Sequence, residues 1–196
     1  KYGEALAILA GDGLQTMAFE VLSSEENIEK IGGSKALLCV KALSHAIGEN
    51  GMLGGQAIDV LNENIRLGQE EHLSMVSMKT AALIVASIHI GGIAAAAPSE
   101  DLGKALEFGF NLGVAFQIKD DLLDVVGNAK SMGKEIGRDE KNHKNTFTSL
   151  YGIEETKKLS DAYHQKSLEA LNALKILNYP TEVLFEATNF LAQRNF

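Results

Sequence analysis

The stretch that decides the fold reads Phe116-Gln117-Ile118-Lys119-Asp120-Asp121-Leu122-Leu123-Asp124. It lies inside an apolar run, residues 102–126, in which large apolar side chains recur every four residues, as on the buried face of a helix. The residues of this expected core stripe are Leu106, Phe110, Val114, Ile118 and Leu122. A second face carries polar groups at i, i+3, i+4 and i+7, namely Gln117, Asp120, Asp121 and Asp124. We therefore expect one long helix with an acidic face.

The acidic face points to a metal ion. Three neighbouring carboxylates repel one another, and each loses solvation if it is buried. Mg²⁺ removes both penalties, because it binds one or two carboxylates, keeps part of its water shell and binds substrate phosphate. A solvated acidic face is the alternative, but apolar residues flank the aspartates closely on both sides. We therefore expect Asp120, Asp121 and Asp124 to bind Mg²⁺.

The composition indicates one domain, residues 1–196, because 45% of the 196 residues are hydrophobic and can form a sizeable core. The net charge of −8 and the scattered basic residues argue against nucleic-acid binding. The lone Cys39 can form no internal disulfide, which fits a reducing, cytoplasmic location. The longest apolar run, residues 81–97, contains Ser87, His89 and two glycines, and is too short and too interrupted for stable membrane insertion.

The periodicity predicts an all-α protein. Apolar residues recur at three and four, only two prolines occur, and no β-type alternation is sustained. The expected helices cover residues 4–22, 34–48 with Ser34 as cap, a segment around 54–59, 70–97, 99–126 with Ser99 as cap, 154–177, and 180–193 with Pro180 in its first turn. Residues 23–27 read as a polar turn and residues 127–146 as a functional loop. Gly11 and Gly13 weaken the first helix, so we expect another helix to pack closely there.

Two further polar pairs lie on apolar helices. Lys79-Thr80 is suited to contact phosphate, although a lysine reaching to solvent is the alternative. Gln56 and Asp59 are three residues apart beside Gly54-Gly55, where glycines permit another helix or a substrate to approach. A polar patch at a helix crossing explains that second pair equally well.

A basic loop follows the acidic face. Its cationic residues are Lys130, Lys134, Arg138, Lys141 and Lys144. A diphosphate bound with Mg²⁺ requires cations that neutralise the leaving group and a segment that can close over it. An ordinary solvated loop is the alternative, supported in part by the loop's own acids. The metal site, the lysines and the loop point to diphosphate chemistry only in combination.

One ordered set of segments covers essentially the whole chain. In chain order it comprises Gly3-Glu4-Ala5 with Leu9-Ala10-Gly11-Asp12, Gly54-Gly55-Gln56-x-x-Asp59, Lys79-Thr80, Phe116-Gln117-x-x-Asp120-Asp121-x-x-Asp124, Gly133-Lys134-x-x-Gly137-x-Asp139 and Lys144-x-Thr146. This set resembles the trans-isoprenyl diphosphate synthase family, and the aspartate-rich segment is similar to that family's second aspartate-rich region. Within the family, Asp139-Glu140-Lys141-Asn142 and Arg194 look most like bacterial farnesyl diphosphate synthases (geranyltranstransferases).

The resemblance implies an isoprenoid-synthase-type helical bundle that condenses isopentenyl diphosphate with dimethylallyl or geranyl diphosphate. The product would be a short-chain prenyl diphosphate such as farnesyl diphosphate, formed when the isopentenyl double bond attacks an allylic cation. By the same resemblance, Mg²⁺ ions join Asp120, Asp121 and Asp124 to the allylic diphosphate. The residues implied to bind substrate are Gln56, Asp59, Lys79, Thr80, Phe116, Gln117, Lys134 and Lys144, of which Lys79, Thr80 and Gln117 are also implied in catalysis.

The family's first aspartate-rich motif has no counterpart in residues 1–196, and by the resemblance it would precede Lys1. We therefore expect an N-terminally truncated chain that is inactive alone. Its first helix resembles part of the family's dimer interface, so we expect a homodimer. One alternative is a non-catalytic helical partner that only dimerises. Another is a terpene cyclase, but the sequence lacks the N-S-E type second metal motif that cyclases usually carry.

Overall fold

The structure is a computed structural model that describes residues 1–126 and 145–194. Every regular element in these two ranges is a helix, which confirms the all-α prediction. The elements are α1 (Glu4–Leu22), α2 (Glu25–Ile31), α3 (Gly33–Ile47), α4 (Met52–Leu61), α5 (Gln69–Val76), the π-helical turn η1 (Ser77–Ala81), α6 (Ala82–Ala95), α7 (Ser99–Val126), α9 (Phe147–Tyr151), α10 (Ile153–Ile176) and α11 (Glu182–Gln193).

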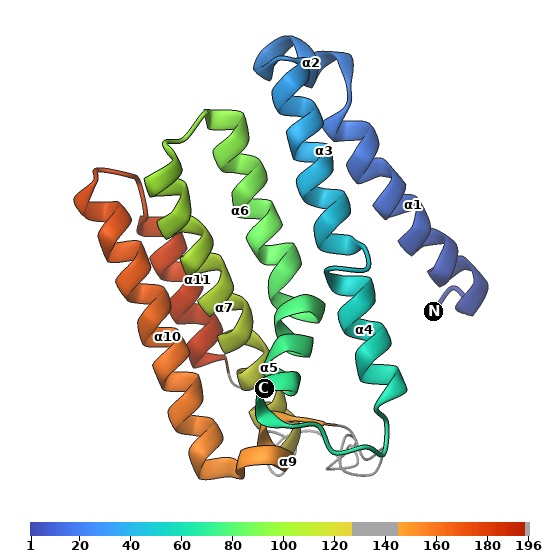
Figure 1. Ribbon diagram of the computed structural model, residues 1–196, viewed down its shortest axis with the longest axis vertical. Helices are drawn as coiled ribbons and strands as arrows, with labels where there is room; N and C mark the ends of the chain where they lie inside the picture. Colours follow the sequence, from blue (N-terminus) through green and yellow to red (C-terminus); the bar gives the residue numbers. More distant parts are fainter. Residues whose placement is uncertain (127–144, 195–196) are drawn as a thin grey trace.

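The long helix α7 lies at the centre of the bundle (Figure 1). It packs most extensively along α10 and also against α6 and η1, while α11 lies against α7 and α10. On the other side of α6, α3 and α4 follow one another in a line, and α1 leans against α3 at the edge of the molecule. The short helices α5 and α9 lie at one end of the bundle, where the C-terminal half of α7 also ends.

Two buried apolar clusters hold α7 in place. One joins Val114, Ile118 and Leu122 of α7 to α5, η1 and Phe147, and the other joins Phe108 to α10. Three residues of the expected core stripe, Val114, Ile118 and Leu122, are therefore buried as predicted. The stripe was wrong at Phe110, which is 36% exposed, whereas Phe108 is buried. A strict four-residue repeat rotates about 40° per step around a helix of 3.6 residues per turn, so it leaves the core face.

The expected helix at residues 70–97 is one continuous segment with a change of winding in its middle. It begins at Gln69, where the Glu71 side chain accepts a hydrogen bond of 2.9 Å from the Gly68 amide. Residues 77–81 then form a π-helical turn that carries Lys79 and Thr80. The segment ends at Ala95, because Ala96 adopts a left-handed conformation with φ of 53°. The spacing of apolar residues does not reveal such a turn. π-helical turns are frequent at functional sites.

Several expected helix ends were wrong. Residues 23–27 do not form only a turn: Ser24 caps α2, and its hydroxyl accepts a hydrogen bond of 3.3 Å from the Asn27 amide. Neither Ser34 nor Ser99 is a cap, since α3 begins at Gly33 and α7 at Ser99 itself. Pro180 lies outside α11, which begins at Glu182 after Thr181. These differences of one or two residues reflect the several capping arrangements that one polar cluster can form.

Helix α1 has no buried residue in the described chain, and its main contact is with α3. A side chain added at Gly11 or Gly13 would meet nothing within 4 Å. The described residues therefore contain no helix packed against these glycines, in contrast to the sequence-based expectation. The large apolar side chains that α1 exposes are Leu6, Ile8, Leu9, Leu14, Met17 and Val21.

By length and composition, two segments could cross a membrane: Glu4–Leu22, with a mean hydropathy of 1.3, and Gln69–Ala95, with 1.6. The second contributes Met75, Val76 and Ala81 to the core around α7. Packing within the bundle accounts for part of its apolar character, since 22% of its most apolar window is buried. The first is the exposed helix α1, whose apolar surface the described residues leave uncovered.

Candidate functional site

The C-terminal half of α7 carries the four polar residues of the acidic face on successive turns. They differ in burial. Asp121 is buried, with 6% of its surface exposed, whereas Gln117, Asp120 and Asp124 are half-buried. The adjacent residues Asp120 and Asp121 therefore have different environments, and 39% of the Asp120 side chain is exposed to solvent.

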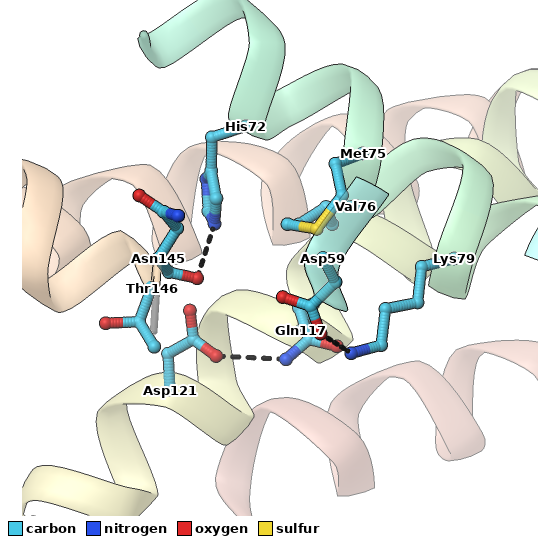
Figure 2. A pocket seen from close by; sticks show the side chains of 9 residues that line it. All are labelled: Asp59, His72, Met75, Val76, Lys79, Gln117, Asp121, Asn145 and Thr146. Atoms are coloured by element: carbon cyan, nitrogen blue, oxygen red, sulfur yellow. Dashed lines mark hydrogen bonds and ion pairs between the residues drawn. The ribbon is translucent and has the colours of Figure 1, made fainter. Parts of the chain in front are cut away.

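Asp121 is tied to the protein through both carboxylate oxygens. Its Oδ2 accepts a hydrogen bond of 2.7 Å from the Phe147 amide at the start of α9. Its Oδ1 accepts a hydrogen bond of 2.9 Å from Nε2 of Gln117 (Figure 2). The carboxylate thus joins α7 to α9. Charge-assisted hydrogen bonds of this kind compensate for the burial of a charged group.

The π-helical turn connects to the same network. The Thr80 hydroxyl donates a hydrogen bond of 2.9 Å to Oε1 of Gln117, so Gln117 bridges Thr80 and Asp121. The structure therefore brings together residues from η1 and α7 that are 37 positions apart in sequence. The family resemblance implied both Thr80 and Gln117 in catalysis, and here the two side chains are in direct contact.

Lys79, on the same turn, pairs with Asp59 of α4. Nζ of Lys79 lies 2.6 Å from Oδ2 of Asp59, with 32% and 10% of the two side chains exposed. The pair forms because α4 approaches the π-helical turn closely: a Cβ on Gly55 would lie 2.4 Å from the Lys79 amide nitrogen. Gly55 thus permits the close helix contact expected of the Gly54-Gly55 pair. Lys79 is partly exposed, but it does not simply extend into solvent.

The end of the described chain returns to the acidic face. The Arg194 guanidinium pairs with Oδ1 of Asp120 and lies over the Phe116 ring, 4.8 Å from its centroid. The cation therefore contacts an acid and an aromatic ring from the same helix. Sequence reasoning used Arg194 only as a mark of resemblance and did not foresee this contact.

A cavity of about 150 Å³ lies between these elements (Figure 2). Asp59, Lys79, Gln117 and Asp121 line it, together with His72. Asp59, Lys79, Gln117 and Asp121 were candidate site residues from the sequence. The structure brings these side chains of α4, η1 and α7 together around one polar cavity. Met75 and Val76 form its apolar wall.

His72 and Asn145 also line this cavity, and neither was a candidate from the sequence. Nε2 of His72, on α5, lies 3.2 Å from the Asn145 carbonyl oxygen, and the imidazole packs edge-on against Phe147 with ring centroids 4.6 Å apart. Burial lowers the pKa of His72, although the Asn145 carbonyl and the Asp59 charge act in the opposite direction. The only signal in the sequence was the position of Asn145 inside the Lys144-x-Thr146 segment.

The remaining candidates are less closely gathered. Gln56 lies on the exposed side of α4 and does not line the cavity, although Asp59 does. Phe116 is half-buried beneath Arg194. Lys134 and Lys144 lie outside the described residues.

The acidic face fits the donor chemistry of Mg²⁺. Asp120 and Asp124 offer carboxylate oxygens about one helical turn apart, and Arg194 already places a positive charge against Asp120. Across residues 1–126 and 145–194, no group of three or more His, Cys, Asp or Glu side chains is arranged to hold an ion. One or two carboxylates would therefore contribute, with water and phosphate completing the shell, as is usual for Mg²⁺.

Comparisons with known proteins agree on one family. A family model described as polyprenyl synthetase matches residues 1–179. The chain is 35% identical over 194 residues to a farnesyl diphosphate synthase of Bacillus subtilis and 33% identical over 196 residues to one of Escherichia coli. It covers 64% and 65% of these two relatives.

Solved structures show the same fold. A crystal structure of geranyltransferase from Helicobacter pylori, complexed with magnesium and isoprenyl diphosphate, matches 97% of this chain with a TM-score of 0.76 and 33% identity. This chain covers 60% of that one. A putative farnesyl-diphosphate synthase from Marinomonas matches with a TM-score of 0.78 and 30% identity, and 64% of its chain is covered. The chain thus spans just under two thirds of the proteins that it resembles.

Proposed function

The chain belongs to the polyprenyl synthetase family, and we propose that the whole protein is a prenyltransferase of isoprenoid biosynthesis. The reaction is the condensation of isopentenyl diphosphate with an allylic diphosphate, dimethylallyl or geranyl, to a short-chain prenyl diphosphate such as farnesyl diphosphate. The allylic carbon–oxygen bond breaks, the isopentenyl double bond forms the new carbon–carbon bond, and a proton leaves. The names of the relatives support the product class.

One observation carries this proposal: η1 and α7 place Lys79, Thr80, Gln117 and the acidic face next to one another. A lysine and a carboxylate face are what a Mg²⁺-bound diphosphate needs, and the hydrogen bond between Thr80 and Gln117 joins the two elements. Their contact in the folded chain supports a common role.

Asp120 and Asp124 would hold Mg²⁺ on the acidic face. Bound there, the ion would neutralise charge on the leaving diphosphate. Asp121 has a different part in this proposal, because the Phe147 amide and Gln117 engage its two oxygens. It fixes the side chain of Gln117, and both of its oxygens already accept hydrogen bonds that join α7 to α9 and order Gln117. Of the three predicted metal ligands, Asp120 therefore ranks first.

Lys79 would contribute positive charge to the same diphosphate, as would the predicted Lys134 and Lys144. Its pairing with Asp59 keeps the ammonium group at the edge of the cavity before substrate binds. Gln56 and Asp59 would act from α4, with Asp59 orienting Lys79. Phe116 would pack against isopentenyl diphosphate, whose binding would require Arg194 to share the ring surface.

The exposed face of α1 supports a homodimer. Leu6, Leu9 and Met17 are more than half exposed, and such a surface favours burial against a partner. A second copy of the chain is the proposed occupant. Light scattering after size-exclusion chromatography should give twice the chain mass, and replacing Leu6 and Leu9 with aspartate should shift it toward one chain. A parental chain that is monomeric at all concentrations tested would contradict the dimer.

The same surface keeps a second candidate open, a helical partner that dimerises without catalysing transfer. The chain covers 64% of the length of its Bacillus subtilis relative, which favours this second candidate for the chain on its own. The lone Cys39 is a free thiol, which fits a reducing, cytoplasmic location for either candidate. The net charge of −8 argues against a nucleic-acid partner for both.

A transfer assay separates the two candidates. The whole protein and, in parallel, the chain of residues 1–196 alone are incubated with radiolabelled isopentenyl diphosphate, geranyl diphosphate and Mg²⁺, and prenyl products are extracted and counted. We expect product from the parent and a loss on the order of 10³-fold with Asp120→Ala, because a ligand is lost where charge is neutralised. Glu107→Ala, at an exposed position on α7, is the matched control and should retain parental turnover. An Asp120→Ala variant as active as the parent would contradict the metal assignment.

A further inference from the structure

His72 is a buried imidazole at the edge of the candidate site. Only 1% of its surface is exposed, and it is one of the buried residues of the eight-residue helix α5. Its Nε2 faces the Asn145 carbonyl oxygen at 3.2 Å. Because a carbonyl can only accept, Nε2 carries the proton. Among the described residues, Nδ1 has no hydrogen-bond partner. A second proton on Nδ1 would therefore be buried without an acceptor, so the ring is neutral with its one proton on Nε2.

The residue that His72 contacts is itself fixed by three side-chain hydrogen bonds. Oδ1 of Asn145 accepts one of 2.9 Å from the Leu67 amide. Its Nδ2 donates to the carbonyl oxygens of Ile65 at 2.9 Å and of Asn62 at 3.2 Å. Asn145 thereby satisfies the main-chain groups of the connection between α4 and α5. With the bond to His72, this one residue joins that connection, α5 and the start of α9.

The contacts continue from Asn145 into the acidic face. Two residues later, the Phe147 amide donates to Asp121, and the Phe147 ring packs against the His72 ring at 4.6 Å. Asp121 accepts from Gln117, and Gln117 accepts from Thr80. Residues 145–147 are therefore held between His72 on one side and Asp121 on the other. Moving them would release the amide that orients Asp121.

We propose that His72 and Asn145 are positioning residues: they hold residues 145–147 so that the Phe147 amide fixes Asp121, and through it Gln117 and Thr80. The effect of these contacts on catalysis rests on the proposed function. Their effect on the position of the Phe147 amide does not. His72 acts as a neutral hydrogen-bond donor and as a packing surface for Phe147. It touches no substrate in this role and transfers no proton.

Amide hydrogen exchange on the chain, followed by NMR, tests this positioning without an activity assay. In His72→Leu, which keeps the apolar volume and loses the donor, we expect the Phe147 amide to exchange on the order of tenfold faster. The Leu171 amide, in the separate core between α7 and α10, should be unchanged, which a general loss of stability would not allow. His72→Gln, which restores a donor, should recover part of the protection. His45→Leu, at an exposed position on α3, is the matched control.

The two proposals fail in different ways. If the Phe147 amide exchanges at the parental rate in His72→Leu, the positioning role is wrong, whatever the enzyme does. If that amide responds but no variant of the whole protein transfers prenyl groups, the proposed function is wrong and the positioning role stands. In a transferring enzyme, His72→Leu should lower kcat about tenfold with little change in KM, because substrate contacts remain.

A measurement on the parental chain covers the case in which the variants do not fold. Nitrogen NMR of labelled histidine reports which ring nitrogen carries the proton. The contact with Asn145 requires the Nε2–H tautomer of His72, with Nδ1 unprotonated. Observation of the Nδ1–H tautomer, or of a ring protonated on both nitrogens at pH 7.5, would overturn the proposal.

Discussion

Asp120 and Asp121 are neighbours in sequence, yet they differ in burial and in the groups that they contact. Asp121 lies inside, where a carboxylate is stable only with hydrogen-bond donors, and the Phe147 amide and Gln117 supply them. Asp120 is half-buried and pairs with the guanidinium of Arg194, whose place beside the carboxylate a metal ion could take. One acidic motif thus contains both a structural carboxylate and an exchangeable one.

Asp121 should therefore matter for stability as well as for activity. In Asp121→Asn, the new amide group must face either the Phe147 amide or Nε2 of Gln117, which are both donors. We expect the free energy of unfolding to fall by about 1–3 kcal/mol, the usual cost of leaving a buried group unsatisfied. Urea denaturation monitored by circular dichroism measures it. Asp161→Asn, at an exposed position on α10, should change little, and an equal loss in both variants would contradict this account.

Lys79 should carry more of the activity than exposed lysines do. It lines the polar cavity beside Gln117 and Asp121, where a positive charge can act on bound diphosphate. For Lys79→Ala in the whole protein we expect turnover to fall roughly 10²- to 10³-fold, as for the loss of one preorganised charge-stabilising group. Lys157→Ala, on the exposed face of α10, is the control. Small and equal effects in steady-state assays would favour a structural role for Lys79.

The buried His72 predicts a stability change with pH. Its ordinary pKa of 6.5 applies to the unfolded chain, and burial lowers the pKa in the folded chain. Asp59 of α4, Lys79 of η1 and Asp121 of α7 are the charged groups lining the cavity with it. Above about pH 6.5 the ring is neutral in both states, so it adds no pH dependence. As pH falls below that value, only the unfolded chain takes up the proton, so stability decreases until the folded pKa is reached.

Denaturation midpoints of the parent and of His72→Leu between pH 7.5 and pH 5 measure this contribution. The parent should lose more stability on acidification than His72→Leu does, while His45→Leu should follow the parent. The difference in slope between the parent and His72→Leu therefore isolates the contribution of His72. Parallel plots of denaturation midpoint against pH for the parent and His72→Leu would show that His72 does not cause the loss of stability on acidification.

At the scale of elements, the contact between α4 and η1 determines where Lys79 points. The contact is possible because position 55 has no side chain: a Cβ there would lie 2.4 Å from the Lys79 amide nitrogen. Backbone cannot move away as a flexible side chain can, so the two helices would have to separate. Gly11 offers the opposite case, because a Cβ there meets nothing within 4 Å.

The two glycines should therefore respond to alanine with opposite sign. We expect Gly55→Ala to lower the free energy of unfolding by about 1–3 kcal/mol through overpacking. Gly11→Ala, in an exposed part of α1, should raise helix stability by up to about 1 kcal/mol. Thermal unfolding of both variants gives the comparison. A neutral Gly55→Ala would mean that α4 and η1 do not approach as closely as described.

The sequence predicted the elements better than their details. Periodicity identified α1, α7 and α10 with nearly correct ends, because long helices carry a sustained apolar repeat in their sequence. It missed α2, whose seven residues are too few for a repeat, and it placed Phe110 in the core because a four-residue spacing drifts around the helix. The π-helical turn at Lys79 leaves no trace in a pattern of apolar residues.

The candidate site was predictable where one helix carries it and not where the fold assembles it. Gln117, Asp120 and Asp121 follow from spacing on α7. The hydrogen bond between Thr80 and Gln117 depends on how η1 meets α7, and the role of Asn145 depends on three main-chain groups that no residue type reveals. His72 looked like any polar residue near the start of a helix.

For the whole molecule, the acidic face lies at the end of the bundle where α5, α9 and the end of α11 also meet (Figure 1). Helix α1, with its exposed apolar side chains, lies along one side of the molecule rather than at this end, so a partner there would leave the acidic face open. Dimerisation and metal binding can therefore be measured independently on this chain. We propose that the acidic face binds diphosphate through Mg²⁺.

Calorimetric titration of the chain with inorganic diphosphate tests this proposal. We expect binding that requires Mg²⁺, is lost when EDTA removes the ion, and weakens at least tenfold in Asp120→Ala, since one carboxylate ligand is removed. Glu107→Ala, on the same helix, should bind like the parent. Diphosphate binding of equal strength without Mg²⁺, or undiminished in Asp120→Ala, would show that the acidic face does not bind diphosphate through the metal ion.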